Sequence, residues 1–281
     1  MRNLGVKFVV ALSLFALAAS AAYAAAEHRI IYIPTKDAIV AKPRVVNLTN
    51  HGGPVIVSAK VVFIFWGPSF SNAASPDFAY AQTIQAFRNN YGTSGEFNVI
   101  TQYSGSNGTI ALTNLAAGTA DLFDTSTPPT NVTDATVQSK VTSYTSSHGG
   151  NDPSTIYEVV IPSTSYSSSG SSDSCGGPNL VYCAYHSWIG SGTSATKYSI
   201  QPYPSCSGCQ VSGWTPVQNQ EHFLSHETRE AVTDPTGSTW YDRSGNEADD
   251  KCAWTPTPFI DGSFAYQYEW SNLVSGCVKT R

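Results

Sequence analysis

The sequence is poor in charge. Asp, Glu, Lys and Arg together make up 12% of its 281 residues, about half of their usual share. The 15 basic residues form no cluster, which argues against nucleic acid as the main partner, because phosphate binding relies on gathered Lys and Arg side chains. The polar residues are mostly uncharged, with 36 Ser and 27 Thr. Aromatic residues make up 12% of the chain, which is enough apolar material to exclude the disordered acidic class.

Long hydrophobic runs are also missing, except near the N-terminus. Residues 8–22 form an unbroken run of apolar and small residues that follows Arg2 and Lys7 and ends in a small-x-small cleavage site at residues 22–24. This arrangement is typical of a secretory signal peptide. A membrane anchor is the alternative, but the run is short for a bilayer span. We therefore predict a signal peptide over residues 1–24 and a secreted protein, extracellular or in the cell wall, with no membrane association after the signal is removed.

Cysteine is absent from the first 174 residues, and six cysteines occupy the remainder. An even number in a secreted chain favours three disulfides, although six cysteines allow about fifteen pairings. The pairs suggested by local spacing are Cys175–Cys183, Cys206–Cys209 and Cys252–Cys277. The alternative is redox or zinc chemistry at the Cys206-x-x-Cys209 segment, although no second cysteine pair stands at zinc-finger spacing.

Caps and apolar periodicity predict three helices, and runs of β-branched and aromatic residues predict strands between them. The expected helices are residues 75–91, 133–144 and 218–233. The expected strands are residues 61–66, 97–103, 110–115, 156–161, 180–189 and 198–203. The Ser- and Gly-rich residues 163–177 are expected to form a loop. No repeat or clear linker is present, so we expect an extended N-terminal arm over residues 25–50 and a single domain over residues 51–281.

Motifs for a serine nucleophile, a P-loop and a dinucleotide-binding loop are all absent. The segment that carries chemistry is the last expected helix. His226 and Glu230 are four residues apart, so they share one helix face and can bind one ion. Glu227 directly follows His226 and can reach a water on that ion as a general base. This is the logic of H-E-x-x-H zinc hydrolases, with Glu in place of the second His.

Two alternatives remain open for this helix. A His-Glu pair followed by another Glu is common on solvated helices, where it binds nothing. His222, four residues before His226, could instead supply the second ligand and displace Glu230. We favour Glu230, because Glu227 must point at the ion from the same side. Asp234 is expected to cap the end of the helix and the turn that follows.

The segment after the helix is rich in oxygen donors, which are Asp242, Glu247, Asp249 and Asp250. A third metal ligand is expected from Glu247 or Asp250, while a polar turn or a small Ca²⁺ loop is the alternative. Zinc accepts Asp or Glu ligands, and additional oxygen donors shift the preference towards Mn²⁺ or Ca²⁺. The expected cofactor is therefore Zn²⁺, with Ca²⁺ or no metal as the alternative.

The order of the expected elements is that of a zincin catalytic subdomain: strand, helix, strand, a pair of strands, then a His-Glu helix. We therefore predict an α/β (α+β) fold with a zincin-like mixed sheet, flanking helices and a disulfide-tied irregular C-terminal region. In that layout an edge strand holds extended substrate. His186 lies on the presumed edge strand, where it could contact substrate or stabilise an oxyanion. A structural histidine beside a disulfide is the alternative.

The same segments resemble the EXORDIUM/phosphate-induced secreted proteins of plants, and more closely their microbial relatives. The most specific match is Ser225-His226-Glu227-x-x-Glu230-Ala231-x-Thr233-Asp234-Pro235. The other matching pieces are His51-Gly52-Gly53-Pro54 before the expected strand at Phe63 to Trp66, Cys183-x-x-His186, Tyr198 to Pro204 with Cys206-x-x-Cys209, and Trp240-Tyr241-Asp242 with Gly245, Glu247, Asp250 and Cys252. The resemblance implies a secreted or cell-wall-associated protein.

Two functions follow from these patterns. The leading one is a secreted metal-dependent hydrolase, most plausibly a zinc metallopeptidase that acts on a peptide or cell-wall polymer. Its metal ligands are His226 and Glu230 with Glu247 or Asp250, and its general base is Glu227. The alternative is a non-enzymatic extracellular or cell-wall protein that binds carbohydrate or protein through its aromatic and Ser/Thr-rich surface.

Overall fold

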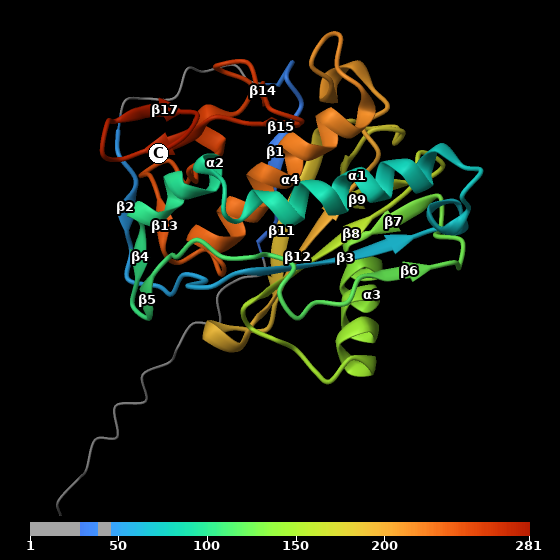
Figure 1. The fold of residues 1–281 in the computed structure, drawn as a ribbon, viewed down its shortest axis with the longest axis horizontal. Coiled ribbons are helices and arrows are strands. Elements are labelled where there is room, and N and C mark those ends of the chain that lie inside the picture. The colour runs from blue at the N-terminus through green and yellow to red at the C-terminus, as the bar shows by residue number, and fades with distance from the viewer. Residues whose placement is uncertain (1–28, 39–45) are drawn as a thin grey trace, which may run out of the picture.

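The core of the protein is a mixed sheet with helices on both faces (Figure 1). The computed structural model describes residues 29–38 and 46–281, so the predicted signal peptide at residues 1–24 lies outside it. The sheet has six strands in the order β1-β11-β12-β8-β3-β6. Their bounds are β1 Ile31–Pro34, β11 Tyr182–Ile189, β12 Thr196–Gln201, β8 Thr155–Val160, β3 Lys60–Trp66 and β6 Leu122–Asp124.

Five of these strands, β1 included, run in one direction, and β11 runs in the opposite direction. β12, β8, β3 and β6 are mutually parallel, whereas β11 is antiparallel to β12, and β1 is antiparallel to β11. β8 is buried along its whole length, because parallel strands in the centre of such a sheet are covered on both faces. This explains why β3 is apolar from Val61 to Trp66 and why β8, which contains the buried Glu158, does not alternate like a half-exposed strand.

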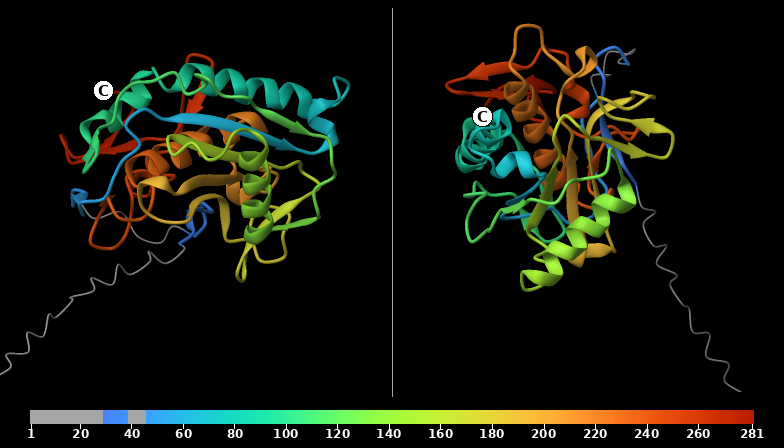
Figure 2. Two further views of the ribbon diagram at one scale, coloured as in Figure 1. Left: turned by 90° about the horizontal axis from the view of Figure 1, so that it is seen from below. Right: turned by 90° about the vertical axis from the view of Figure 1, so that its right-hand side faces the viewer.

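The helices divide between the two faces of the sheet, as the two views in Figure 2 show. α1 (Pro76–Tyr91) and α4 (Pro216–Thr233) cover one face, and α3 (Asp134–Ser147) covers the other. Ser75 caps α1 through its side chain, and Gly92 follows its last residue, as the sequence predicted. Among the described residues, no helix combines the length and the apolar character needed to cross a membrane.

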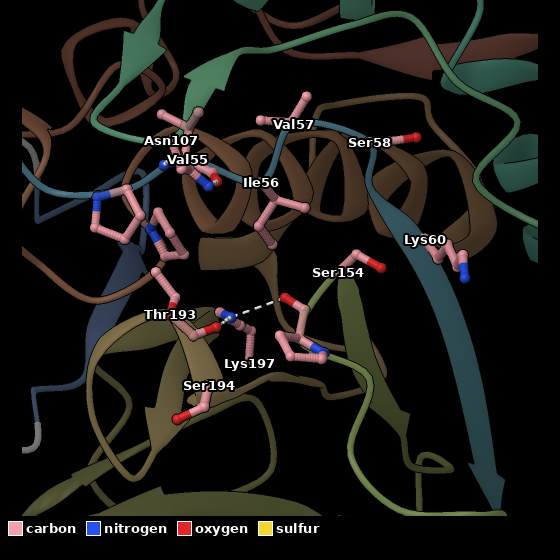
Figure 3. A pocket seen from close by; sticks show the side chains of 13 residues that line it. Val55, Ile56, Val57, Ser58, Lys60, Asn107, Ser154, Thr193, Ser194 and Lys197 are labelled. Carbon is pink, nitrogen blue, oxygen red and sulfur yellow. Dashed lines mark hydrogen bonds between the residues drawn. The ribbon is translucent and has the colours of Figure 1, made fainter.

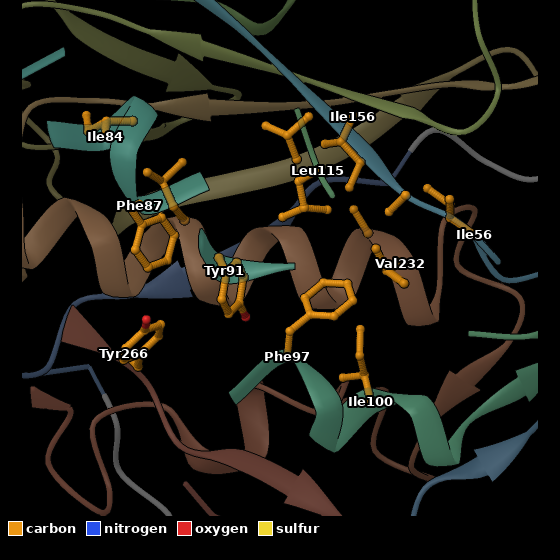
Figure 4. Close-up of a cluster of buried hydrophobic side chains, with 14 of the residues drawn as sticks. Ile56, Ile84, Phe87, Tyr91, Phe97, Ile100, Leu115, Ile156, Val232 and Tyr266 are labelled. Atoms are coloured by element: carbon orange, nitrogen blue, oxygen red, sulfur yellow. The ribbon is translucent and has the colours of Figure 1, made fainter. Parts of the chain in front are cut away.

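The larger apolar core lies between the sheet and the α1–α4 layer (Figure 4). Ile84, Phe87 and Tyr91 point into it from one face of α1, together with Tyr80. The spacing of these four residues is the periodicity that predicted the helix. Tyr91 also donates a hydrogen bond from its hydroxyl to the Ser225 carbonyl at 3.0 Å, which ties α1 to the middle of α4.

Small strands and one short helix complete the described fold. Their bounds are β2 Thr49–Asn50, α2 Gly95–Asn98, β4 Ser104–Gly105, β5 Gly108–Thr109, β7 Asn131–Thr133, β9 Tyr166–Ser169, β10 Ser172–Asp173, β13 Trp240–Tyr241, β14 Phe259–Asp261, β15 Phe264–Tyr266, β16 Glu269–Ser271 and β17 Gly276–Val278. The last five form two-stranded pairs within the C-terminal region or with β2. This region is therefore less irregular than predicted.

Three sequence-based expectations for secondary structure were wrong. Residues 97–103 are not a strand but the end of α2 and a 3₁₀ turn, because the Ser94 side chain caps a helical start at the Phe97 amide. Residues 110–115 lie in no strand. The expected loop at 163–177 contains β9 and β10, because serine hydroxyls here satisfy neighbouring polar groups, such as Ser174 Oγ on the Ser167 amide at 2.9 Å.

β11, which carries His186, is not the edge of the sheet. The edge position is taken by β1 from the N-terminal arm, whose Ile31 stands opposite His186. The presumed edge strand is therefore covered, and its backbone hydrogen bonds are already made. An extended ligand cannot pair with β11 unless β1 leaves it.

The six cysteines form three disulfides, Cys175–Cys206, Cys183–Cys209 and Cys252–Cys277. The third was expected, and the first two correct the expected pairs. Cys206 precedes a 3₁₀ turn (Ser207–Cys209) that packs on β11, and Cys209 is its last residue. Each sulfur therefore reaches a different partner, and no free thiol remains for the redox or zinc alternative. Disulfides of this kind are typical of extracellular proteins.

No thiol should titrate in the intact protein, since all six cysteines are bonded. Cys252→Ser should lower the free energy of unfolding by roughly 2–5 kcal/mol, the usual cost of losing a native bridge. Urea unfolding measures this change, and the double variant that also replaces Cys277 is the matched control because it removes the same bridge. Two or more titratable thiols under denaturing, non-reducing conditions would contradict the assignment.

Candidate metal centre

α4 is built as a buried helix although most of its residues are polar. Thr215 and Gln218 form a capping box at its start, and Pro216 occupies the first turn. Every residue from Asn219 to Thr233 is buried. The polar residues of the His-Glu motif therefore do not form a solvated face, and each of them needs a partner inside the protein.

His226 and Glu230 face each other on α4, one turn apart. His226 Nε2 lies 3.0 Å from Glu230 Oε2, but the two atoms are not aligned for a hydrogen bond. On the other side of the ring, Nδ1 donates to Gln267 Oε1 at 3.2 Å, so Nε2 is the unprotonated nitrogen and keeps its lone pair for a ligand. Asp250 Oδ1 lies 3.9 Å from the same Nε2. A second-layer acceptor on one ring nitrogen is typical of metal-ligating histidines.

His186 enters the same cluster from β11. Its Nδ1 donates to Glu227 Oε2 at 2.7 Å and lies 3.8 Å from Glu230 Oε2. Its Nε2 lies 3.8 Å from Glu247 Oε2, which is beyond hydrogen-bond range. His186 is therefore oriented by Glu227 and presents its second nitrogen to Glu247.

Two triads of possible ligands result, and both contain Glu230. One consists of His226, Glu227 and Glu230, and the other of His186, Glu230 and Glu247, with the ligand atoms of each triad within 4.8 Å of one another. In tetrahedral coordination at about 2.1 Å, neighbouring ligand atoms are about 3.4 Å apart. The separations of 3.0 to 3.9 Å between possible ligand atoms of the cluster therefore suit a metal ion.

Several polar atoms of the cluster are buried without a hydrogen-bond partner among the described residues. They are His186 Nε2, His226 Nε2, Glu227 Oε1, Glu230 Oε2 and both carboxylate oxygens of Glu247. A buried polar atom left in this state costs about 1–3 kcal/mol, and more if it is charged. The unpartnered atoms come from facing residues, so one ligand could satisfy several of them.

The electrostatics of the cluster also favour a cation. Burial, and then the charges of neighbouring carboxylates, raise the pKa values of Glu227 and Glu247 well above their usual range. The pKa of Asp250 rises to about 7 for the same two reasons. Burial, and then the charge of His226, lower the pKa of His186 to about 3. A divalent cation would stabilise the carboxylates and leave the imidazoles neutral, which is the state that binds metal.

A buried ion-pair network supports the cluster from behind. Arg229 pairs with Asp249 and, at 2.7 Å, with Glu269. Gln267 donates to the Asp249 carbonyl at 2.8 Å while its Oε1 accepts from His226. Asp249 is thus paired with Arg229, and it belongs to neither ligand triad. Gln267 was missed by the sequence analysis, since no local pattern connects it with a histidine 41 residues earlier.

The remaining sequence candidates lie outside the cluster. His222 packs among the aromatic rings of Trp214, Phe223 and Trp254 and belongs to neither triad. Asp234 accepts from the backbone amides of the turn after α4, as expected of a cap. Both Asp242 oxygens accept from protein donors, including the Lys251 ammonium at 3.1 Å, so Asp242 offers no free oxygen to a Ca²⁺ ion.

A cavity of about 640 Å³ lies elsewhere, beyond the C-terminal end of α4 (Figure 3). It is lined by the Val55–Ser58 segment, Ser154 and Lys197, and by none of the ligand candidates. Burial lowers the pKa of Lys197 to about 8, and its ammonium donates to the Pro153 carbonyl at 2.8 Å. This cavity contains no acid–base pair, so the chemistry points to the enclosed cluster.

Comparison of the chain with known proteins returned no match, neither to a protein-family model nor to a curated protein nor to a solved structure. The resemblance to the EXORDIUM proteins and the zincin-like layout therefore stay predictions. The chain adopts a mixed α/β fold with a central mixed sheet and three disulfides.

Proposed function

We propose that the protein is a secreted metal-dependent hydrolase with a zincin-like layout, and that peptide bonds are its substrate. The single observation that carries this proposal is the set of buried, unpartnered imidazole nitrogens and carboxylate oxygens around Glu230. Two imidazoles and several carboxylates suit Zn²⁺ best among the common divalent ions, with Mn²⁺ next.

In this proposal each residue of the cluster has its own role. His226 Nε2, Glu230 and Asp250 would hold the ion, which would acidify a water and polarise a carbonyl. Glu227 would act as the general base through Oε1, the oxygen that His186 leaves free. Gln267 fixes the His226 tautomer, and His186 fixes the rotamer of Glu227.

A second candidate function is favoured by the burial of the cluster. The side chains of His186, His226, Glu227, Glu230 and Glu247 are all at most 1% exposed. Structural metal sites are closed, whereas catalytic sites keep an open position. The alternative is therefore a non-enzymatic extracellular protein that binds carbohydrate or protein and uses the ion for stability alone.

Metal removal should lower the melting temperature, because an ion that binds only the folded state stabilises it by mass action. His226→Ala should lose the ion bound at Nε2 and most of this thermal shift, as measured by calorimetry with and without added Zn²⁺. His222→Ala is the matched control, since it removes a buried imidazole from the same helix but none of the ligands. If His226→Ala binds Zn²⁺ as well as the parent does, the site lies elsewhere.

A further inference from the structure

The ligands of the cluster exceed what one ion needs. The His226 triad and the His186 triad share only Glu230, so this carboxylate lies between two groups of ligands. Each group adds one imidazole and one further carboxylate, which is Glu227, the proposed general base, in the first group and Glu247 in the second. The first group lies next to Asp250 and Gln267. The second group combines His186 of β11 with Glu247 from the segment after α4.

The second group has its own unsatisfied atoms. His186 Nε2 and both oxygens of Glu247 have no hydrogen-bond partner, and both side chains are at least nine-tenths buried. Because Nδ1 of His186 donates to Glu227, its Nε2 carries the lone pair and lies 3.8 Å from Glu247 Oε2. Two acceptor atoms therefore lie 3.8 Å apart, and neither is satisfied by a donor of the described residues.

The number of carboxylates in the cluster also favours a second cation. Glu227, Glu230, Glu247 and Asp250 carry four negative charges when ionised, and one divalent ion neutralises half of them. Arg229 is occupied by Asp249 and Glu269. An uncompensated charge inside a protein is strongly unfavourable. Arg29 also acts on Glu247 and Asp250, although it lies at the surface. A second divalent ion would offset the two buried negative charges that the first ion leaves.

We propose that the protein binds a second divalent metal ion through His186 Nε2 and Glu247, with Glu230 bridging it to the ion held by His226. This inference rests on the proposed function and deepens it. Two ions that share a carboxylate are typically about 3.5–4 Å apart in hydrolases, where they hold the attacking and the departing oxygen. His186 is then a metal ligand and is not available to stabilise an oxyanion.

The test counts metal ions. The full mature chain is purified without chelators or a His tag, dialysed against Mn²⁺, and measured by elemental analysis and electron paramagnetic resonance. The parent should hold two Mn²⁺ per chain with a spin-coupled spectrum, as expected for a carboxylate-bridged pair. His186→Ala and Glu247→Gln should each hold one uncoupled Mn²⁺. His222→Ala, the matched control, should hold two.

Each other outcome separates the two proposals. One uncoupled Mn²⁺ in the parent, retained in His186→Ala and lost in His226→Ala, overturns the second site and leaves the proposed function standing. No bound Mn²⁺ in the parent, with none for Zn²⁺ either, overturns both. Two Mn²⁺ in both His186→Ala and Glu247→Gln place the second ion elsewhere and also overturn the inference. Circular dichroism identifies a variant that fails to fold. If either His186→Ala or Glu247→Gln does so, the metal content of the other variant tests the second site.

Discussion

Replacement of Glu227 by Gln is expected to leave the protein folded and metal-bound while lowering its hydrolytic rate by roughly 10²-fold or more, the scale of general-base loss. Gln keeps the shape and the helix propensity of Glu. It also keeps an acceptor oxygen for His186 Nδ1, which Glu227 now binds at 2.7 Å. What it loses is the carboxylate that takes a proton. The assay is cleavage of a quenched-fluorescent peptide library in the presence of Zn²⁺, Mn²⁺ or Co²⁺.

Glu230→Gln is the comparison variant that distinguishes loss of the general base from loss of the metal ion. Glu230 Oε2 lies 3.0 Å from His226 Nε2 and belongs to both triads, so its replacement should remove metal first and activity as a consequence. The two variants look alike in an activity assay and differ in a metal assay. Full activity of Glu227→Gln on a substrate that the parent cleaves would rule out the proposed mechanism. A parent that cleaves no library member with any of the three ions would favour the non-enzymatic binding protein.

Arg229→Met should lower the free energy of unfolding by about 3–5 kcal/mol, the usual cost of breaking a buried ion pair from one side. Arg229 is fully buried, and it is the counterion of Asp249 and Glu269. Met fills much of the same volume, so the loss reflects two buried carboxylates without a cation. Urea unfolding of the disulfide-intact protein measures this change.

Lys60→Met is the matched control for that measurement. Lys60 pairs with Asp152 at 3.0 Å, but the two side chains are 35% and 41% exposed. An ion pair at the surface contributes about 0–1 kcal/mol, so this variant should lose little stability. Equal losses in the two variants would mean that the Arg229 network does not stabilise the fold from inside.

Part of the site was predictable because helix geometry is local. The four-residue offset of His226 and Glu230 puts both side chains on one face of any helix, and the Asp234-Pro235 stop fixes where that helix ends. The helix was expected from residue 218, and the cap at Thr215 starts it two residues earlier, at Pro216. The same holds for α1, whose cap and apolar spacing are contained in seventeen consecutive residues from Ser75 to Tyr91.

The strands were predictable only in part. The runs that became β3 and β8 are long enough to identify from composition. The helical turn at Phe97 and the serine-rich strand β9 could not be predicted from composition. In such short segments a cap or a pairing partner outweighs the intrinsic propensity of the residues. Spacing along the chain predicted Cys252–Cys277 correctly but gave the wrong partners for the other four cysteines. The 3₁₀ turn at Ser207–Cys209 directs Cys206 and Cys209 to different partners, Cys175 and Cys183.

Only the tertiary structure decided how the cluster is assembled. It brought His186 to Glu227 across 41 residues, set Gln267 behind His226, and covered β11 with β1. It also buried α4 from Asn219 to Thr233. From its sequence alone, this polar helix could equally lie at the surface. The reason is physical: the period of a helix is a property of neighbouring residues, whereas strand order, register and burial depend on contacts between distant segments that no local pattern encodes.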